Sequence, residues 1–167
     1  MSISPDTLST LNITELELTA ALFKDVQEIF STMLGVDDIT HVPLQTESPD
    51  TYSTSLTAMV GLAGKYSGLV SINLPMPLAL SFTSMMLDID VTEINGDVHD
   101  AMGEIANMLG GSFKQHLSKA GDDLKLSTPS VVSGSSLTVS TGSKTDVLTL
   151  DLKSGPEMFS VSLTIEQ

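Results

Sequence analysis

The chain has 167 residues, of which 41% are hydrophobic and 17% charged, and its formal net charge is -14. Its 21 acidic residues outnumber its seven lysines, and it has no arginine. This excess of negative charge argues against binding to nucleic acid or to an anionic membrane surface. Without arginine, the chain lacks the guanidinium group that often neutralises phosphate, so a partner would have to supply most of the charge stabilisation in any phosphate chemistry. The absence of cysteine excludes disulfides, thiolate catalysis and thiolate metal sites.

The length and composition predict one globular domain over residues 1–167. The N-terminal sequence Met-Ser-Ile-Ser-Pro-Asp lacks the basic start and apolar core of a signal peptide. The apolar segment Leu69–Phe82 is interrupted by Pro75 and Pro77 and is too short to span a bilayer. We therefore expect a cytoplasmic protein with no membrane insertion.

The first half of the chain begins with a predicted helix over residues 16–34, where apolar residues recur at helical spacing up to a stop at Gly35. Extended segments follow, a short strand and then two strands that form a hairpin around the turn Ala63-Gly64: 42–46, 52–62 and 65–74. Pro75 and Pro77 then open a short helix over residues 78–87, since proline is tolerated in a first turn.

The second half contains a long amphipathic helix that starts near Glu93 or Asp97 and runs to His116, with Asp97 as the natural cap if the helix starts late. The last fifty or so residues are rich in Ser and Thr, but their alternating apolar positions favour strands over a linker. The expected strands, with a turn at 154–156 between the last two, are 130–140, 145–153 and 158–166.

An internal repeat connects the two halves. The segment Ser31–Gly35 aligns with Ala106–Gly110, and the hairpin region 55–74 resembles 147–165. This alignment matches Asp25 to Asp100, Ile29 to Glu104 and Thr32 to Asn107. The expected fold is therefore α+β, a pseudo-two-fold repeat with two long helices packed on a largely antiparallel sheet.

A row of polar residues marks the long helix of the second half. Asp100, Glu104 and Asn107 are spaced by four and three residues, which places them on one helix face. The two acids repel each other at this spacing, and each glycine inside a helix costs about 1 kcal/mol relative to alanine. Such a helix suits the close approach of a partner, with its glycines allowing the backbones to meet: Gly103, Gly110 and Gly111. The opposite face is apolar: Val98, Ala101, Met102, Ile105, Met108, Leu109 and Phe113.

The spacing Asp-x-x-x-Glu-x-x-Asn, followed by Met-Leu-Gly-Gly, resembles the motif of the CheC/CheX/FliY chemotaxis phosphatases. Asp100, Glu104 and Asn107 occupy the three motif positions, within the stretch Asp97–Gly111. CheC-like members carry two such motifs. Because Ile29 and Thr32 replace the Glu and Asn of the first half in the alignment above, the chain resembles the CheX branch.

The resemblance implies dephosphorylation of a CheY-type response regulator that carries an aspartyl phosphate. In this family the glutamate, here Glu104, pairs with the regulator's lysine, and the asparagine, here Asn107, orients the attacking water. Asp100 would play a supporting role, and Gly103, Gly110 and Gly111 would assist partner binding. The Mg²⁺ would be carried by the regulator, so no cofactor of the chain's own is expected. A homodimer is expected by analogy with the CheX branch.

Other readings stay open from the sequence. The chain could be a non-catalytic module that binds a receiver domain or another signalling protein, or an assembly component similar to those of the flagellar switch. A metal-dependent hydrolase is disfavoured, because His116 falls on the apolar side of the helix and His99 points away from it. One helix would then not bring both imidazoles and Glu104 to a common ion.

Overall fold

In the computed structural model the chain folds into helices packed on one antiparallel sheet, described for residues 3–42, 55–118, 123–135 and 144–166. The helices of this part of the chain are α1 (Pro5–Leu11), α2 (Glu15–Leu34), α3 (Met76–Leu87) and α4 (Gly96–Leu117). The strands are β1 (Thr40–His41), β2 (Ser55–Gly64), β3 (Gly68–Pro75), β4 (Leu124–Leu126), β5 (Ser130–Gly134), β6 (Thr145–Ser154) and β7 (Glu157–Glu166). None of the helices in these ranges combines the length and the apolar character that a membrane span requires.

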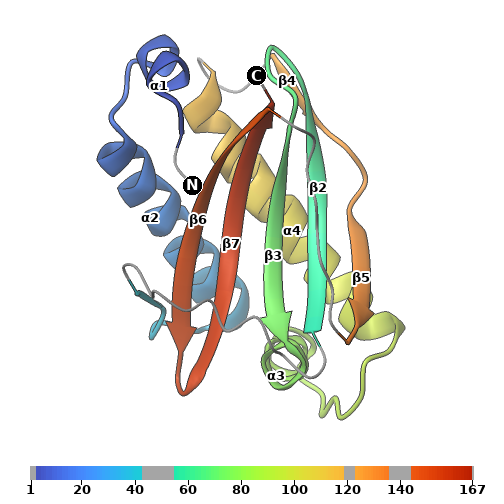
Figure 1. Cartoon of the computed structure of the whole chain (residues 1–167). Coiled ribbons are helices and arrows are strands. Elements are labelled where there is room, and N and C mark those ends of the chain that lie inside the picture. Colours follow the sequence, from blue (N-terminus) through green and yellow to red (C-terminus); the bar gives the residue numbers. More distant parts are fainter. Residues whose placement is uncertain (1–2, 43–54, 119–122, 136–143, 167) are drawn as a thin grey trace.

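The seven strands form one sheet in the order β1-β6-β7-β3-β2-β4, with β5 also paired to β2. All of the pairings are antiparallel. The two hairpins, β2–β3 and β6–β7, meet at the centre, where Ser71 of β3 pairs with Ser162 of β7. The long helices α2 and α4 lie side by side across the same face of the sheet (Figure 1). The predicted α+β class with two long helices on an antiparallel sheet is confirmed.

The pseudo-two-fold arrangement appears in how the halves exchange strands. Each half has a long helix, a short strand and a hairpin, in that order. The short strand of each half pairs with the hairpin of the other: β1 with β6, and β5 with β2. Neither half could therefore complete its part of the sheet alone, and the two halves fold as one interlocked unit.

Local capping interactions fix the starts of both long helices. The side chain of Thr14 accepts from the Glu17 backbone N–H, and the Glu17 carboxylate accepts from the Thr14 backbone N–H at 2.9 Å, which forms a capping box. Hydrogen bonds from Thr14 lower the pKa of Glu17 below its ordinary value. At α4 the cap is Asn95, whose Oδ1 accepts from the Val98 N–H at 3.2 Å. Asp97 was expected as the cap only if the helix started late; the helix begins at Gly96, so Asp97 lies in its first turn and Asn95 is the cap.

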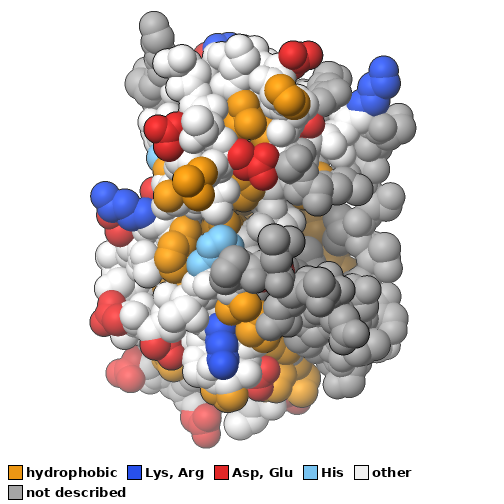
Figure 2. All heavy atoms as spheres, turned by 60° about the vertical axis from the view of Figure 1, so that its left-hand side comes forward, with side chains coloured by type: hydrophobic (Ala, Val, Ile, Leu, Met, Phe, Trp, Pro, Cys, Tyr) orange, Lys and Arg blue, Asp and Glu red, His pale blue; other side chains and the backbone are white. Residues whose placement is uncertain are grey.

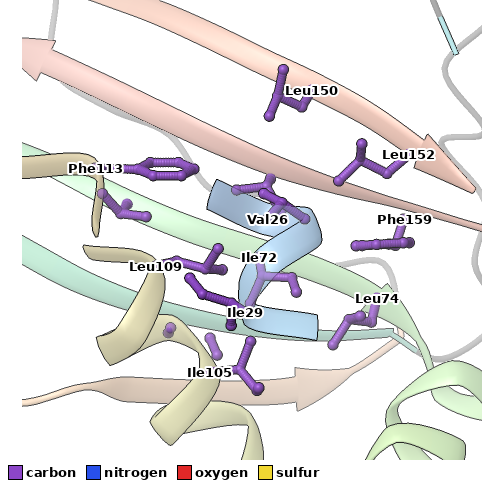
Figure 3. Close-up of a cluster of buried hydrophobic side chains, with 14 of the residues drawn as sticks. Val26, Ile29, Ile72, Leu74, Ile105, Leu109, Phe113, Leu150, Leu152 and Phe159 are labelled. Atoms are coloured by element: carbon purple, nitrogen blue, oxygen red, sulfur yellow. The ribbon is translucent and has the colours of Figure 1, made fainter. Parts of the chain in front are cut away.

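The hydrophobic core lies between the helices and the sheet. Strand residues at alternating positions and helix residues at helical spacing point into it from both halves (Figure 3). Phe30 of α2, Phe82 of α3 and Phe159 of β7 form an aromatic cluster with ring centroids 5.1–5.9 Å apart. All three side chains are at most 2% exposed, so this cluster joins elements of both halves.

Several elements differ from the sequence expectations. Helix α1 was not predicted; it is too short to show a periodic pattern, and it is held by Ser4 and Thr7, whose hydroxyls donate to the Asp146 carboxylate at 2.8 and 2.6 Å. The short strand expected at 42–46 begins earlier, as β1, and most of that range lies outside the described residues. The three-residue strand β4 was missed, and Gly64 belongs to β2, so the hairpin turns after it.

Candidate functional site

The predicted polar row lies on the solvent-facing side of α4. Asp100 and Glu104 are exposed, and Asn107 is half-buried. The apolar residues predicted for the opposite face are buried, apart from Met108, which is half-buried. The helical spacing therefore placed both faces of α4 correctly.

A shallow groove runs beside this row, between α4 and the start of β5 with the residues that lead into it. It has a volume of about 400 Å³ and is lined on the helix by His99, Asp100, Gly103 and Glu104. The opposite wall consists of Thr128, Pro129 and Val131. These wall residues carry no local sequence signal of a site, because they reach α4 only through the pairing of β5 with β2. Sequence reasoning did not identify them.

The carboxylates of the row have no partner within the described part of the chain. Asp100 and Glu104 form neither an ion pair nor a hydrogen bond with any residue in these ranges. The neighbouring His99 is engaged, with its Nε2 3.2 Å from the Ser133 hydroxyl. Among the same residues, no group of three or more His, Asp or Glu side chains is placed to hold a metal ion. The row thus presents two acids that an external cation can reach.

The three glycines of α4 occupy different environments. Gly103 is buried, and a Cβ there would meet Pro129 and Val131 at an ordinary 3.5 Å. Gly110 is also buried, and a Cβ there would lie 2.6 Å from Cγ1 of Val60 in β2. Gly111 has nothing within 4 Å of that position. Close packing of α4 on the sheet accounts for Gly110, so a role in partner contact stays a prediction for Gly111 and for Gly103 at the groove.

This difference predicts opposite effects for two adjacent alanine substitutions. Both Gly110→Ala and Gly111→Ala gain about 1 kcal/mol of helix propensity. Only Gly110→Ala forces a methyl group against Val60, and such overpacking costs about 1–3 kcal/mol. We expect Gly111→Ala to raise the free energy of unfolding. The free energy of unfolding of Gly110→Ala should be lower than that of Gly111→Ala by about the overpacking cost. Urea denaturation of the two variants measures this difference, and equal stabilities would contradict the close packing.

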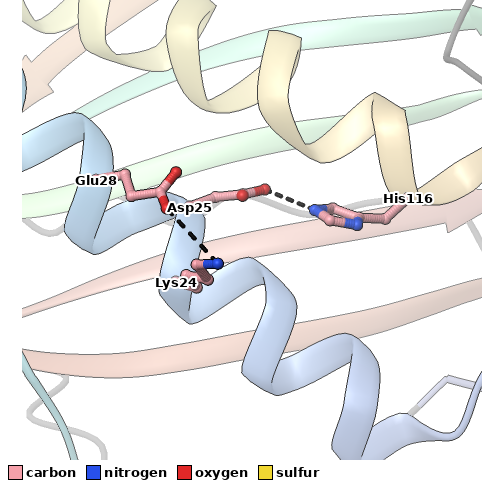
Figure 4. Close-up of polar contacts among 4 residues, drawn as sticks. All are labelled: Lys24, Asp25, Glu28 and His116. Carbon is pink, nitrogen blue, oxygen red and sulfur yellow. Dashed lines mark hydrogen bonds and ion pairs between the residues drawn. The ribbon is translucent and has the colours of Figure 1, made fainter.

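His116 connects the two long helices instead of lying on the apolar side of α4. Its Nε2 is 2.7 Å from Oδ2 of Asp25 on α2, and the side chains are 27% and 17% exposed (Figure 4). The sequence expectation for His116 is wrong, because this side of α4 faces α2 and not the sheet. An ion pair within α2, between Lys24 and Glu28 at 3.8 Å, lies at the surface.

The alignment that matched Ile29 to Glu104 is also wrong. Ile29 is 6% exposed and belongs to the core, whereas Glu104 faces solvent. The error comes from the glycines that anchored the alignment. Gly35 ends α2 with a left-handed φ of 66°, while Gly110 lies inside α4 and packs on β2. The same three letters, Met-Leu-Gly, therefore serve as a helix stop in one half and as a packing contact in the other.

Residues 56–153 match the family model described as chemotaxis phosphatase CheX. The chain belongs to this family. The match begins in β2 and ends in β6, so it contains α4, the polar row and the groove.

Relatives of known description agree with the CheX assignment. The protein described as CheY-P phosphatase CheX from Thermotoga maritima is 28% identical over 120 residues, which cover 71% of this chain and 77% of the relative. A CheX structure from Desulfovibrio desulfuricans is 28% identical, with a TM-score of 0.72, and the match covers 90% of this chain and 99% of that one. A CheX in complex with CheY, BeF₃ and Mg²⁺ from Borrelia burgdorferi has the same fold, with a TM-score of 0.74 at 18% identity over 89% of this chain and 97% of that chain.

Proposed function

We propose that this CheX-family protein hydrolyses the aspartyl phosphate of a CheY-type response regulator, with Glu104 and Asn107 as the residues that act on the partner. The description of the Thermotoga relative as a CheY-P phosphatase and the CheX–CheY complex from Borrelia support the activity and the partner. The observation that carries the assignment of residues is the solvent-facing Glu104, which has no partner within the described residues, with Asn107 one turn further along α4.

Glu104 would anchor the regulator by pairing with a lysine of its phosphorylation site. The carboxylate is exposed at the edge of the groove, and Asp100 one turn away adds to the negative potential. The repulsion between these two acids is relieved when a cation binds between or beside them. Asp100 would therefore support the docking of the regulator's lysine without contacting the phosphoryl group.

Asn107 would position the water that attacks phosphorus. Its amide can donate one hydrogen bond and accept another while it remains uncharged beside the phosphoryl group. The water oxygen forms a bond to phosphorus, the bond from phosphorus to the aspartyl oxygen breaks, and inorganic phosphate leaves as the aspartate carboxylate is restored. Catalysis by orientation is the dominant protein contribution to phosphoryl transfer. The Mg²⁺ would be held by the regulator, so the protein would need no cofactor of its own.

The direct test is the decay of the phosphoaspartate in the cognate regulator, phosphorylated with a small-molecule phosphodonor, with and without this protein. Faster decay supports the proposal. Unchanged decay overturns it, and if the regulator still binds tightly, the protein would be the non-catalytic module considered from the sequence. The proposal also includes a homodimer and a cytoplasmic location. Sedimentation in the same buffer would test whether the protein is a homodimer.

Removal of the Glu104 carboxylate is expected to weaken binding of the regulator. A hydrogen-bonded charge pair contributes about 1.5–3 kcal/mol, so Glu104→Ala should raise the Kd for the beryllofluoride-activated regulator about 10- to 100-fold. The matched control is Glu166→Ala, because Glu166 is an exposed glutamate at the end of β7. Its neighbour Ile165 is buried against the helices, so the side chain of Glu166 lies on the other face of the sheet. Titration calorimetry measures both values; equal affinities for the two variants would contradict the role of Glu104.

A further inference from the structure

A second groove lies beside α2. This helix lies on the left-hand side of Figure 1, the side that Figure 2 brings forward. The groove has a volume of about 460 Å³ and is lined on the helix by Gln27, Glu28, Ser31 and Thr32, and on the opposite wall by residues of the segment 36–39. That segment leads into β1, which pairs with the hairpin of the other half. The groove beside α4 is built in a similar way, from a long helix and the start of β5 with the residues that lead into it.

The burial pattern fixes which residues of the two helices correspond. The buried positions of α2 after its first turn each have a buried counterpart 76 residues further along the chain, in α4. The pairs are Leu22 with Val98, Val26 with Met102, Ile29 with Ile105, Phe30 with Ala106 and Leu34 with Gly110. A shift of one residue would instead place the buried Ile29 opposite the exposed Glu104. The physical register is therefore the one set by burial.

In this register Glu28 occupies the position of Glu104, and Ser31 occupies that of Asn107. Glu28 and Ser31 are both exposed, and both line the α2 groove. The first half therefore keeps the glutamate of the polar row, and it has Lys24 where the second half has Asp100 and a serine where the second half has the asparagine. The sequence alignment on Met-Leu-Gly is shifted by one residue from this register, so it did not match Glu28 with Glu104 or Ser31 with Asn107.

We propose that the α2 groove is a second docking site for the receiver domain of the response regulator, one that binds the phosphorylated domain without hydrolysing it. The proposal rests on the function proposed for the α4 site. Glu28 is available to a lysine of the regulator because its partner Lys24 lies 3.8 Å away with both side chains largely exposed, 75% and 65%. Exposed pairs at this helical spacing contribute only about 0.3–0.5 kcal/mol, so a regulator lysine would readily replace Lys24.

Ser31 accounts for the lack of hydrolysis. Its hydroxyl oxygen lies one bond closer to the helix than the amide atoms of an asparagine. It therefore does not reach the position in the α2 groove where an asparagine would orient the attacking water. A hydroxyl also offers a single donor on a freely rotating bond, whereas a planar amide fixes donor and acceptor in one orientation. Loss of orientation of this kind lowers rates about 100-fold in other systems.

The number of regulator molecules bound per chain tests the docking site. We expect the wild-type protein to bind two molecules of beryllofluoride-activated regulator per chain, Glu104→Ala to retain one of them, and the double variant Glu104→Ala/Glu28→Ala to bind neither. Titration calorimetry gives the stoichiometry. One site per chain in a wild-type protein that accelerates dephosphorylation would overturn this inference alone, whereas a wild type that neither binds nor accelerates would overturn the proposed function as well.

A gain of activity tests the register and the role of Ser31 together. In the background of Asn107→Ala, the added substitution Ser31→Asn is expected to raise the rate of phosphoaspartate decay about tenfold or more, because it restores an amide at the position of Asn107. The control is Ser9→Asn in the same background, an exposed serine on α1 that lies outside both grooves and should give no gain. No gain from Ser31→Asn in a folded chain, or an equal gain from Ser9→Asn, would contradict the assignment.

Discussion

Replacement of Asn107 with alanine is expected to slow the dephosphorylation of the regulator about 100-fold, because the attacking water loses the group that aligns it with phosphorus. The loss should appear in the rate constant at saturating regulator and not in the affinity. Asn107 is half-buried on α4, three residues after Glu104, so the truncation leaves the exposed glutamate in place. The time course of phosphoaspartate decay in the phosphorylated regulator gives the rate, and titration with the beryllofluoride complex of the regulator gives the Kd.

The matched control for Asn107→Ala is Gln115→Ala. Gln115 carries the same kind of side chain, is exposed and lies two turns further along the same helix, outside the groove. It should change neither the rate nor the affinity. Circular dichroism of both variants would verify that α4 is intact. A normal rate for Asn107→Ala would show that a different group orients the water.

Replacement of Phe159 with alanine is expected to lower the free energy of unfolding by about 3–5 kcal/mol, the usual cost of removing a buried phenyl ring. The ring is 2% exposed and packs at 83° to Phe82 with centroids 5.9 Å apart and at 36° to Phe30 with centroids 5.6 Å apart. Since domains of this size are stable by only about 5–15 kcal/mol, the variant should be close to unfolding. Urea denaturation followed by circular dichroism measures the change.

Leu16→Ala is the control for this prediction. Leu16 is also a large apolar residue, but its side chain is 80% exposed on α2, so truncation should change the stability by less than about 0.5 kcal/mol. Phe159 lies in β7, and its two aromatic neighbours lie in α2 and α3 of the other half. A small effect of Phe159→Ala would mean that the halves are not held together by this cluster.

The sequence was sufficient for the features that depend on local periodicity. The spacing of Asp100, Glu104 and Asn107 predicted a solvent-facing row, and the apolar residues between them predicted the buried face of α4; both are confirmed. Alternating apolar positions likewise predicted the hairpins that form the centre of the sheet. These predictions succeed because helix and strand geometry fix which neighbours share a face, independent of the rest of the chain.

Features that depend on contacts between distant segments were missed or misplaced. Helix α1 is held by hydrogen bonds from Ser4 and Thr7 to Asp146, far along the chain. The wall of the α4 groove comes from β5 and the residues just before it, and His116 pairs with Asp25 across the two helices. No local pattern encodes such contacts, since each of them joins segments that lie far apart in the sequence.

The sequence by itself determined the composition limits, the two long amphipathic helices and the row of Asp100, Glu104 and Asn107, because residue type and helical spacing are sufficient for these. Only the tertiary structure decided what the glycines do and how the halves correspond. Gly110 is set by its contact with Val60, and Gly35 by the end of α2. The burial pattern, which a motif alignment does not include, showed that Glu28 corresponds to Glu104. The structure also showed the second groove, which lies beside Glu28 in the first half.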